Sequence, residues 1–527
     1  MDSASNGRPT RPRSRVARAI PSDAIELQEQ VEQLMADLRL AVIFGGDKIS
    51  PGSVVYQSSN TRPWKSYEAV AHDIAGSLER IGFRNIQLMP DDMRLGDRIR
   101  REGIHMAWLN SGGVQGYNSA AHGPAMLELF GIPYVGHDPL TASTLDNKHA
   151  FKREAICADL PTAPFSTWHS ARGPFRPDVN SRFQRAFADY PGPFVIKPVS
   201  GRASLHVHVA EDRESLPDMV DEVYRATENV VLIEKYLPGR EFCIAVAGPV
   251  TARRGRLVRG REPFAFAALE RVLASDEKIF TSMDVKPITK DRYRALDPQH
   301  DSEQLGLMRR LACEVFLEFN LSSLVRLDMR ADENGALNIL EANPKPDLKR
   351  PAEGITNLIS AGLPECGMDY DDLILSLLAD RLDFLFTHRG ESVRHILDLF
   401  DRRSSGGPRR RLHGAATTLA DGPATSARAT GVPASAQEHI AGWAIEDAPA
   451  PDVHALVAGV QKIGRAMALI NEIAAELNVL ALNATIEAAR AAEARKDIEA
   501  IGPSETRPAG GAAASSRAAG RRARLVS

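Results

Sequence analysis

The sequence predicts a mixed fold, in which an open α/β domain is followed by α+β lobes, and three observations carry this prediction. A buried-strand run at residues 40–44 ends in Gly45-Gly46, and helical periodicity follows at residues 67–81. Apolar runs typical of strands recur at residues 86, 106–109, 194–198, 230–236 and 242–247, with a helix expected at residues 146–159. Residues 325–343 then alternate as an antiparallel hairpin. Strands that first alternate with helices and later pair in a hairpin favour this mixed architecture.

Composition and charge are those of an ordinary globular protein of several domains. The chain has 527 residues, 43% of them hydrophobic and 25% charged, which is enough for about two to four domains. A formal charge of −3 gives no general attraction to nucleic acid or to a membrane surface, so neither partner is expected.

Cysteine spacing and the chain start favour a cytoplasmic location. The four cysteines are scattered without a CxxC pair, which is typical of reduced thiols: Cys157, Cys243, Cys313 and Cys366. The Arg-rich start lacks the apolar core of a signal peptide, and no uninterrupted apolar run reaches about 18 residues, so no membrane span is expected.

Shifts in texture divide the chain into six expected segments. They are a disordered basic tail and an added helix (1–39), an N-terminal α/β domain (40–140), a second domain of two lobes (141–395), a flexible linker (396–452), a long helix (453–500) and a disordered tail (501–527). The linker is expected because Arg, Ser, Gly and Pro gather after residue 401 and an Ala/Thr/Gly/Pro stretch follows.

The hairpin at residues 325–343 predicts a metal site from strand register alone. Asn334-Gly335 between two alternating runs favours a two-residue type I′ turn. Counting back along both strands sets Asp328 opposite Glu341 and Arg326 opposite Asn343, all on one face because side chains alternate with period two. Facing carboxylates repel unless a cation lies between them or one stays protonated. Magnesium would fit Asp328, Glu341 and the amide oxygen of Asn343. A solvated polar face on an edge hairpin is the alternative.

Three further residues carry charge where a nucleotide could bind. Lys197 ends a strand that leads into a small-residue loop, and Lys148 begins a helix, so both ammonium groups could hold phosphate. Glu241 follows an apolar strand and a turn, where its carboxylate could accept hydrogen bonds from ribose hydroxyls. Each of them taken alone is typical of a solvated surface charge.

The order of these motifs over residues 40–386 resembles the ATP-grasp superfamily, most closely its D-alanine D-alanine ligase branch. The resemblance implies an ATP-grasp fold in which Lys148 and Lys197 hold the ATP phosphates and Glu241 binds ribose. It implies that adenine meets the backbone of Glu234, Lys235, Tyr236 and Leu237. Asp328, Glu341 and Asn343 would carry one or two Mg²⁺ ions, with Mn²⁺ as a substitute.

The resemblance also implies a reaction and its partners. In this family ATP converts a carboxylate into an acyl phosphate, which an amine attacks to give an amide. Arg326 would stabilise the charge developing on the acyl oxygen, and Lys278 matches the lysine of the family's mobile loop. We therefore expect an amino acid or peptide as substrate and a homo-oligomer as the assembly.

Departures from the family pattern all concern the substrate. The loop after Lys197 lacks the paired serines of the family's lid, and Pro346-Asp347 replaces its Pro-Gly. The acidic residue and the histidine that receive the first D-alanine have no counterpart in Gly45-Gly46-Asp47 or at residues 110–113, and Glu68 is the substitute we expect. The sequence therefore does not identify the substrate.

A heptad seam at residues 460–491 predicts a coiled-coil helix. Residues 470–491 resemble the signalling tip of methyl-accepting chemotaxis proteins, which implies contact with the chemotaxis histidine kinase and its coupling protein. The matching contact residues are Leu482, Asn483, Ile486, Glu487 and Arg490. The return helix of that tip is missing, which favours a truncated or out-of-frame end, or one arm left from a fusion. A helix that only dimerises is the alternative. A second functional hypothesis is therefore a chemotaxis signalling protein that uses its ATP-grasp module as a small-molecule sensor.

Overall fold

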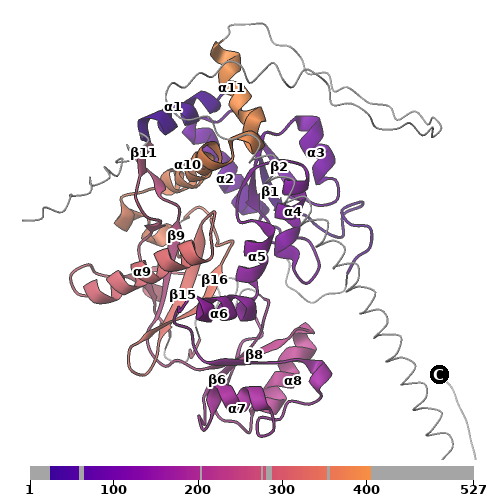
Figure 1. Cartoon of the computed structure of the whole chain (residues 1–527), viewed down its shortest axis with the longest axis vertical. Helices are drawn as coiled ribbons and strands as arrows, with labels where there is room; N and C mark the ends of the chain where they lie inside the picture. Colours follow the sequence, from indigo (N-terminus) through magenta and orange to yellow (C-terminus); the bar gives the residue numbers. More distant parts are fainter. Residues whose placement is uncertain are drawn as a thin grey trace, which may run out of the picture. The chain divides into compact units, whose positions relative to one another are not determined.

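The computed structural model describes residues 24–58, 65–201, 205–274, 277–279, 288–352 and 356–404. All of them lie within one compact unit, Met1–Leu412 (Figure 1). The expected chemotaxis-like helix and its contact residues, Leu482, Asn483, Ile486, Glu487 and Arg490, lie outside the described residues, as do most of the expected linker and both expected disordered tails.

The first sheet is parallel, with the order β2-β1-β3-β4. Its strands are β1 (Arg39–Gly45), β2 (Asn85–Asp91), β3 (Met106–Asn110) and β4 (Tyr134–Val135). Its helices are α2 (Glu68–Ile81), α3 (Leu95–Glu102), α4 (His122–Leu129) and α5 (Pro139–Asp146). The open α/β domain predicted from the sequence is confirmed. The carboxyl ends of its parallel strands share one edge, which is where ligands bind in such sheets.

The second sheet is antiparallel, with the order β5-β8-β6-β7. It comprises β5 (Phe165–Trp168), β6 (Phe194–Pro198), β7 (His208–Ala210) and β8 (Val231–Lys235), with α7 (Ser181–Phe187) and α8 (Leu216–Thr227). Both helices contribute buried side chains to the same core as the strands, including Phe183, Val220 and Phe194. The amphipathic spacing of the helices therefore covers one face of this sheet.

The third sheet has the order β14-β13-β9-β15-β16, and β12 also pairs with β9. Its strands are β9 (Glu241–Ala247), β12 (Phe264–Ala265), β13 (Leu269–Arg271), β14 (Tyr293–Ala295), β15 (Val325–Ala331) and β16 (Leu337–Asn343). Helix α6 (Lys148–Cys157) and helix α9 (Ser302–Glu318) share a buried core with β9, β15 and β16. The other face of this sheet is thereby left to carry the polar side chains of β15 and β16.

Three helices join the first sheet to the rest of the unit. Helix α10 (Tyr370–His388) contacts α2 and the small β10 (Val250–Arg253) and β11 (Arg256–Arg259) ribbon, while α1 (Ala24–Leu34) contacts β11, α10 and α11 (Arg394–Ser404). Short 3-10 turns complete the chain: η1 (Ser119–Ala121), η2 (Ser170–Arg172), η3 (Lys290–Arg292), η4 (Ser360–Gly362), η5 (Pro364–Cys366) and η6 (Gly390–Val393). Helix α11 thus extends into the range expected to be linker.

The prediction of one helix over residues 146–159 is wrong in one respect, because the helix is interrupted at Asn147. Helix α5 ends at Asp146 and α6 begins at Lys148, with Asn147 in an extended conformation between them. The Asn147 side chain accepts hydrogen bonds from the amides of His149 and Ala150, which caps α6. The break turns the start of α6 toward Val199, whose carbonyl accepts the Lys148 amide at 2.8 Å.

The predicted turn of the β15–β16 hairpin is wrong, but the register at the site is confirmed. The loop has three residues, since Asp332 pairs with Ala336 and Gly335 adopts a φ of 83°. A second irregularity follows, because Met329 pairs with Ile339 whereas Asp328 pairs with Glu341, which leaves Leu340 as a bulge. The longer loop and the bulge shift the register in opposite senses. Asp328 therefore faces Glu341, and Arg326 faces Asn343, as predicted.

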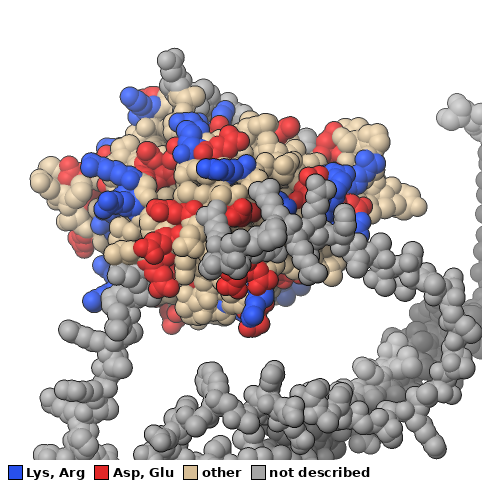
Figure 2. All heavy atoms as spheres, turned by 90° about the horizontal axis from the view of Figure 1, so that it is seen from above, with Lys and Arg blue, Asp and Glu red and all other residues tan. Residues whose placement is uncertain are grey.

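Acidic and basic side chains are interspersed over the described surface seen in Figure 2, in keeping with the small formal charge of the chain. Within the described ranges, no helix combines the length and the apolar character needed to cross a bilayer.

Candidate functional site

A cavity of about 250 Å³ gathers most of the residues expected at the site. It lies between the second and third sheets, and loops of the first domain also line it. The expected residues that line it are Lys148, Lys197, Glu234, Lys235, Tyr236, Leu237, Glu241, Arg326, Asp328, Glu341 and Asn343. The fold thus brings together residues that are almost 200 positions apart in the sequence. They come from α6, β6 and the hairpin, and they are Lys148, Lys197, Asp328, Glu341 and Asn343.

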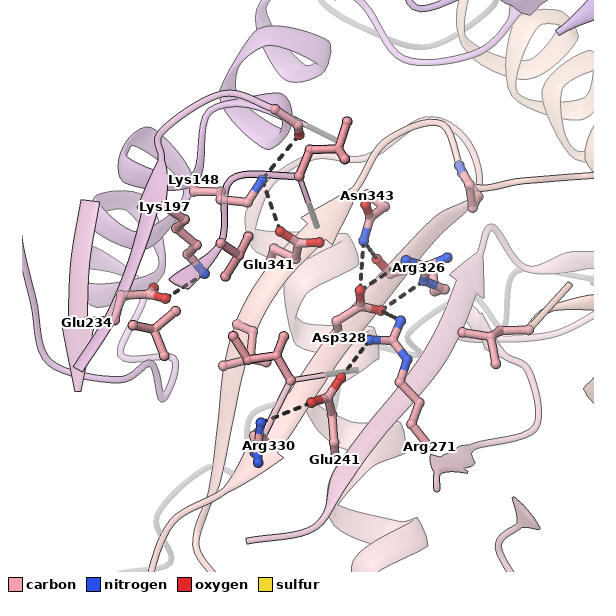
Figure 3. Close-up of a pocket in the computed structure, with 18 of the residues that line it drawn as sticks. Lys148, Lys197, Glu234, Glu241, Arg271, Arg326, Asp328, Arg330, Glu341 and Asn343 are labelled. Carbon is pink, nitrogen blue, oxygen red and sulfur yellow. Dashed lines mark hydrogen bonds and ion pairs between the residues drawn. The ribbon is translucent and has the colours of Figure 1, made fainter. Parts of the chain in front are cut away.

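One wall of the cavity is an arginine cluster, in which Arg271, Arg326 and Arg330 surround Asp328 and Glu241 (Figure 3). Arg326 holds Asp328 through two parallel hydrogen bonds, from Nε at 2.8 Å and from Nη2 at 3.0 Å. Arg271 lies 2.8 Å from the same carboxylate and donates to Glu241 at 2.9 Å, while Arg330 donates to the second oxygen of Glu241 at 3.2 Å. Both carboxylates are buried, so these charge-assisted bonds replace their hydration.

Strand pairing explains why the sequence did not predict Arg271 and Arg330. Arg271 of β13 pairs with Glu241 of β9, and Glu241 pairs with Arg330 of β15, so the three side chains form one row across three strands. The alternation of charge across the row is visible only when the strand order is known. Both carboxylate oxygens of Glu241 already accept hydrogen bonds from guanidinium groups. The ribose contact expected of Glu241 would have to share these oxygens with the arginines.

The opposite wall is a lysine cluster of Lys148, Lys152 and Lys197 with Glu234 and Glu341. Lys152 and Lys197 lie 2.7 and 2.5 Å from the two oxygens of Glu234. Burial alone would raise the pKa of Glu234, but the two ammonium groups hold it below its usual value. The Glu234 side chain is thus part of a buried ion-pair cluster, which is separate from the adenine contact expected of its backbone. Lys152, one helical turn after Lys148, was not predicted because it is completely buried and has no motif of its own.

Glu341 shows how the predicted carboxylate repulsion is relieved. Lys148 lies 3.1 Å from Glu341, and its ammonium also donates to the Gly201 carbonyl at 3.4 Å. Although burial acts to raise the pKa of Glu341, Lys148 and Lys197 lower it to about 2. Asp328 is neutralised by arginines and Glu341 by a lysine. The facing carboxylates are therefore stable without a metal, and repulsion between them does not by itself require one.

The donor set nevertheless suits a hard divalent cation. Asp328, Glu341 and Asn343 supply two carboxylates and an amide at neighbouring positions of one hairpin face, and such oxygen ligands suit Mg²⁺. Asn343 Nδ2 lies 3.3 Å from Asp328 Oδ2, so its amide must rotate to offer the oxygen. Among the described residues no three His, Cys, Asp or Glu side chains lie close enough to hold a metal. Asn343 is therefore needed as the third ligand.

The remaining expected residues differ in how they meet the cavity. Leu237 is buried in its lining, and the Tyr236 hydroxyl accepts a hydrogen bond from Arg330 at 3.0 Å. Lys235 pairs with Glu333 at 2.7 Å, which directs its ammonium toward the hairpin loop. The ammonium of Lys278 pairs with Glu211 and is more than half exposed, and only its carbonyl joins the arginine cluster, by accepting from Arg330 at 2.9 Å. The expected catalytic role of the Lys278 side chain is not supported by this position.

Residues 156–379 match the family model described as D-ala D-ala ligase C-terminus. The match supports the resemblance to ATP-grasp ligases of the D-alanine D-alanine ligase type. It covers the second and third sheets and the arginine cluster, while Lys148 and Lys152 of the lysine cluster precede it.

Similar sequences include D-alanine–D-alanine ligases. That of Lacticaseibacillus casei is 25% identical over 260 residues, which are 49% of this chain, and the chain spans only 63% of that relative's length. That of Gloeobacter violaceus is 23% identical over 347 residues, which are 66% of this chain and the whole relative. Among solved structures, the D-alanine–D-alanine ligase of Bacillus anthracis complexed with ATP is 18% identical, with a TM-score of 0.46 over 66% of this chain and 98% of that one.

Proposed function

We propose that the protein is an ATP- and Mg²⁺-dependent ligase that joins a carboxylate to an amine through an acyl phosphate. The observation that carries the proposal is that Lys148 and Lys197 meet the carboxylate–amide set of Asp328, Glu341 and Asn343 in one cavity. All of these residues except Lys148 lie within the part of the chain that matches the ligase family. That the substrate is an amino acid or a peptide is also part of the proposal. The ligases of Lacticaseibacillus casei and Gloeobacter violaceus, whose names include D-alanine, are only 23–25% identical to this chain.

The two clusters have separate roles in this proposal. Lys148 and Lys197 bind phosphate oxygens, because both ammonium groups reach the cavity from buried stems. Asp328, Glu341 and Asn343 would hold Mg²⁺, which neutralises the charge that develops during phosphoryl transfer. Arg326 is fixed by its two bonds to Asp328, so its guanidinium needs no reorganisation to stabilise an acyl oxygen.

The test is phosphate release by the full chain with ATP, Mg²⁺ and a panel of D- and L-amino acids. We expect release above the ATP-only rate with at least one amino acid, and a loss of about 100-fold or more in Asp328→Asn and Glu341→Gln. Glu314→Gln, at an exposed position of α9, is the matched control and should leave the rate unchanged. Absence of stimulated release, or full activity in both site variants, rejects the proposal.

A further inference from the structure

Four side chains from three segments of the chain meet at the end of the cavity that lies toward the first domain, and we call them the Tyr67 cluster. Lys65 and Tyr67 precede α2, Asn110 ends β3, and Lys345 follows β16. The ammonium nitrogen of Lys345 lies 3.1 Å from the centroid of the Tyr67 ring, and that of Lys65 lies 5.3 Å from the same centroid. Lys65, Tyr67 and Lys345 all line the cavity. Two positive charges therefore converge on one aromatic ring at this end.

The backbone holds this cluster in a conformation that the residue types alone would not favour. Tyr67 adopts φ 56° and ψ 18°, a left-handed conformation that is uncommon for a bulky aromatic residue. The buried Asn110 side chain donates to the Tyr67 carbonyl at 3.1 Å and accepts from Lys345 at 3.3 Å. Strained backbone held by a buried polar side chain is typical of functional sites. One amide thus holds the backbone of Tyr67 and the ammonium of Lys345.

Glycine at position 45 allows the segment to lie so close to the sheet. The Gly45 amide donates to the Ser66 carbonyl at 2.6 Å, and a Cβ at this position would lie 2.7 Å from the Lys65 carbonyl oxygen. Only a residue without a side chain permits this approach. The Gly45-Gly46 end of the first strand therefore positions Lys65 and Tyr67, rather than binding a ligand through its own backbone.

Two carboxylates of the described residues lie near this end. Asp347 lines the cavity, but its Oδ1 accepts the Lys349 amide at 2.9 Å in a local turn. Glu68, which was expected to substitute for the family's acidic residue at the first D-alanine, is exposed on the first turn of α2 and is not among the residues that line the cavity. A neutral amino acid brings its own ammonium beside its carboxylate and would meet two lysines. A substrate with a second carboxylate carries a net negative charge, which the two lysines attract.

We infer that the Tyr67 cluster binds a carboxylate that is additional to the α-carboxylate, so that the substrate is an acidic amino acid or a similar dicarboxylate. This inference rests on the proposed ligase function. The Tyr67 ring packs against the aliphatic part of that substrate, while Lys65 and Lys345 bind its side-chain carboxylate. Specificity of this kind is carried by loops of the first domain and by the segment after β16, outside the hydrogen-bonded strands.

The experiment compares phosphate release from ATP with matched pairs of acids and amides, glutamate against glutamine and aspartate against asparagine, in both D and L forms. We expect kcat/KM to be at least tenfold higher for an acid than for its amide. Lys345→Met should raise the KM for the acid about tenfold and leave the KM for ATP unchanged, as expected for one charge-assisted hydrogen bond. Lys345→Arg should restore much of the preference, and Lys349→Met, at an exposed side chain of the same loop, should change nothing.

The possible outcomes separate this inference from the function on which it rests. Equal use of acid and amide, or release with neutral amino acids alone, overturns the acidic substrate but leaves a ligase. A rise in the KM for ATP in Lys345→Met, without a change for the acid, also overturns it, because Lys345 would then bind phosphate. If calorimetry shows ATP binding while no amino acid stimulates release, the ligase function fails and the inference fails with it.

Discussion

The arginine and lysine clusters differ from the Tyr67 cluster in what holds their charged groups. In the first two, the carboxylates contact cations on strands or on α6, as Glu234 does with Lys152 and Lys197. In the Tyr67 cluster, Lys65, Tyr67 and Lys345 lie on loops, and one amide, Asn110, links the Tyr67 backbone to an ammonium. The difference teaches that the arginine and lysine clusters are parts of the folded core, whereas three side chains of the Tyr67 cluster lie on loops. Variants should therefore affect stability at the walls and specificity at the loops.

The largest effect is expected for Arg271→Met. This substitution leaves Asp328 and Glu241 buried with one fewer guanidinium each, and breaking a buried ion pair costs about 3–5 kcal/mol. We expect the free energy of unfolding, measured by urea denaturation, to fall by this amount. Arg256→Met, at an exposed position of β11, is the control. Similar stability of the two variants would show that the arginine cluster is not part of the core.

A smaller loss is expected for Lys152→Met, because Lys197 still compensates Glu234. We expect a loss of about 2–3 kcal/mol in the free energy of unfolding. ATP binding should weaken as well, since the net charge of Lys152, Lys197 and Glu234 falls by one beside the proposed phosphate site. Calorimetric titration measures the affinity for ATP. Lys290→Met, at an exposed position of η3, is the control. Unchanged ATP affinity would mean that Lys152 only fills the core.

Acid should remove the stability that the ion pair of Glu341 contributes to the fold. Its pKa is lowered to about 2 in the fold from 4.5, so its stabilisation is complete above pH 4.5 and is lost as pH falls toward 2. Between these two pH values the free energy of unfolding of the unmodified protein should fall by about 1–3 kcal/mol more than that of Glu341→Gln. Urea denaturation midpoints of both proteins, measured across this pH range, test the difference. Parallel curves for the two proteins would contradict the ion pair with Lys148.

The smallest effect on stability is expected for Asn110→Ala. It removes hydrogen bonds to Tyr67 and Lys345, at a cost of about 1–2 kcal/mol for a buried polar site. The KM for the amino-acid substrate should rise while ATP affinity is retained, because the residue touches only the substrate end. A loss of stability as large as that of Arg271→Met would erase the distinction between core walls and substrate loops.

The hairpin shows how a correct site can follow from an incorrect turn. The sequence predicted a two-residue loop and no bulge, and the structure has three loop residues and a bulge at Leu340. Both deviations move the pairing by one residue, in opposite directions, so Asp328 still faces Glu341. The alternation of apolar side chains required this register, since a one-residue slip would bury the carboxylates in the core behind β15.

Other site residues lay beyond sequence reasoning for different reasons. Arg271 and Arg330 reach Glu241 through pairings of β13 and β15 with β9, which join segments that are far apart in the chain. Lys152 is spaced as an ordinary helix residue, and its role follows only from its burial beside Glu234. Lys65, Tyr67 and Lys345 come together because Asn110 links loops of two domains.

The sequence alone located several strands along the chain, the carboxylate face of the hairpin, and the two lysines that we propose bind phosphate, Lys148 and Lys197. It could do so because periodicity and turn residues act over a few neighbouring positions, and the motifs repeat a known order. Only the tertiary structure decided which cations neutralise Asp328, Glu341 and Glu234, and which side chains close the substrate end. Those contacts depend on strand order and on the approach of distant loops, where burial makes charged groups pair with whatever partners the fold brings within reach.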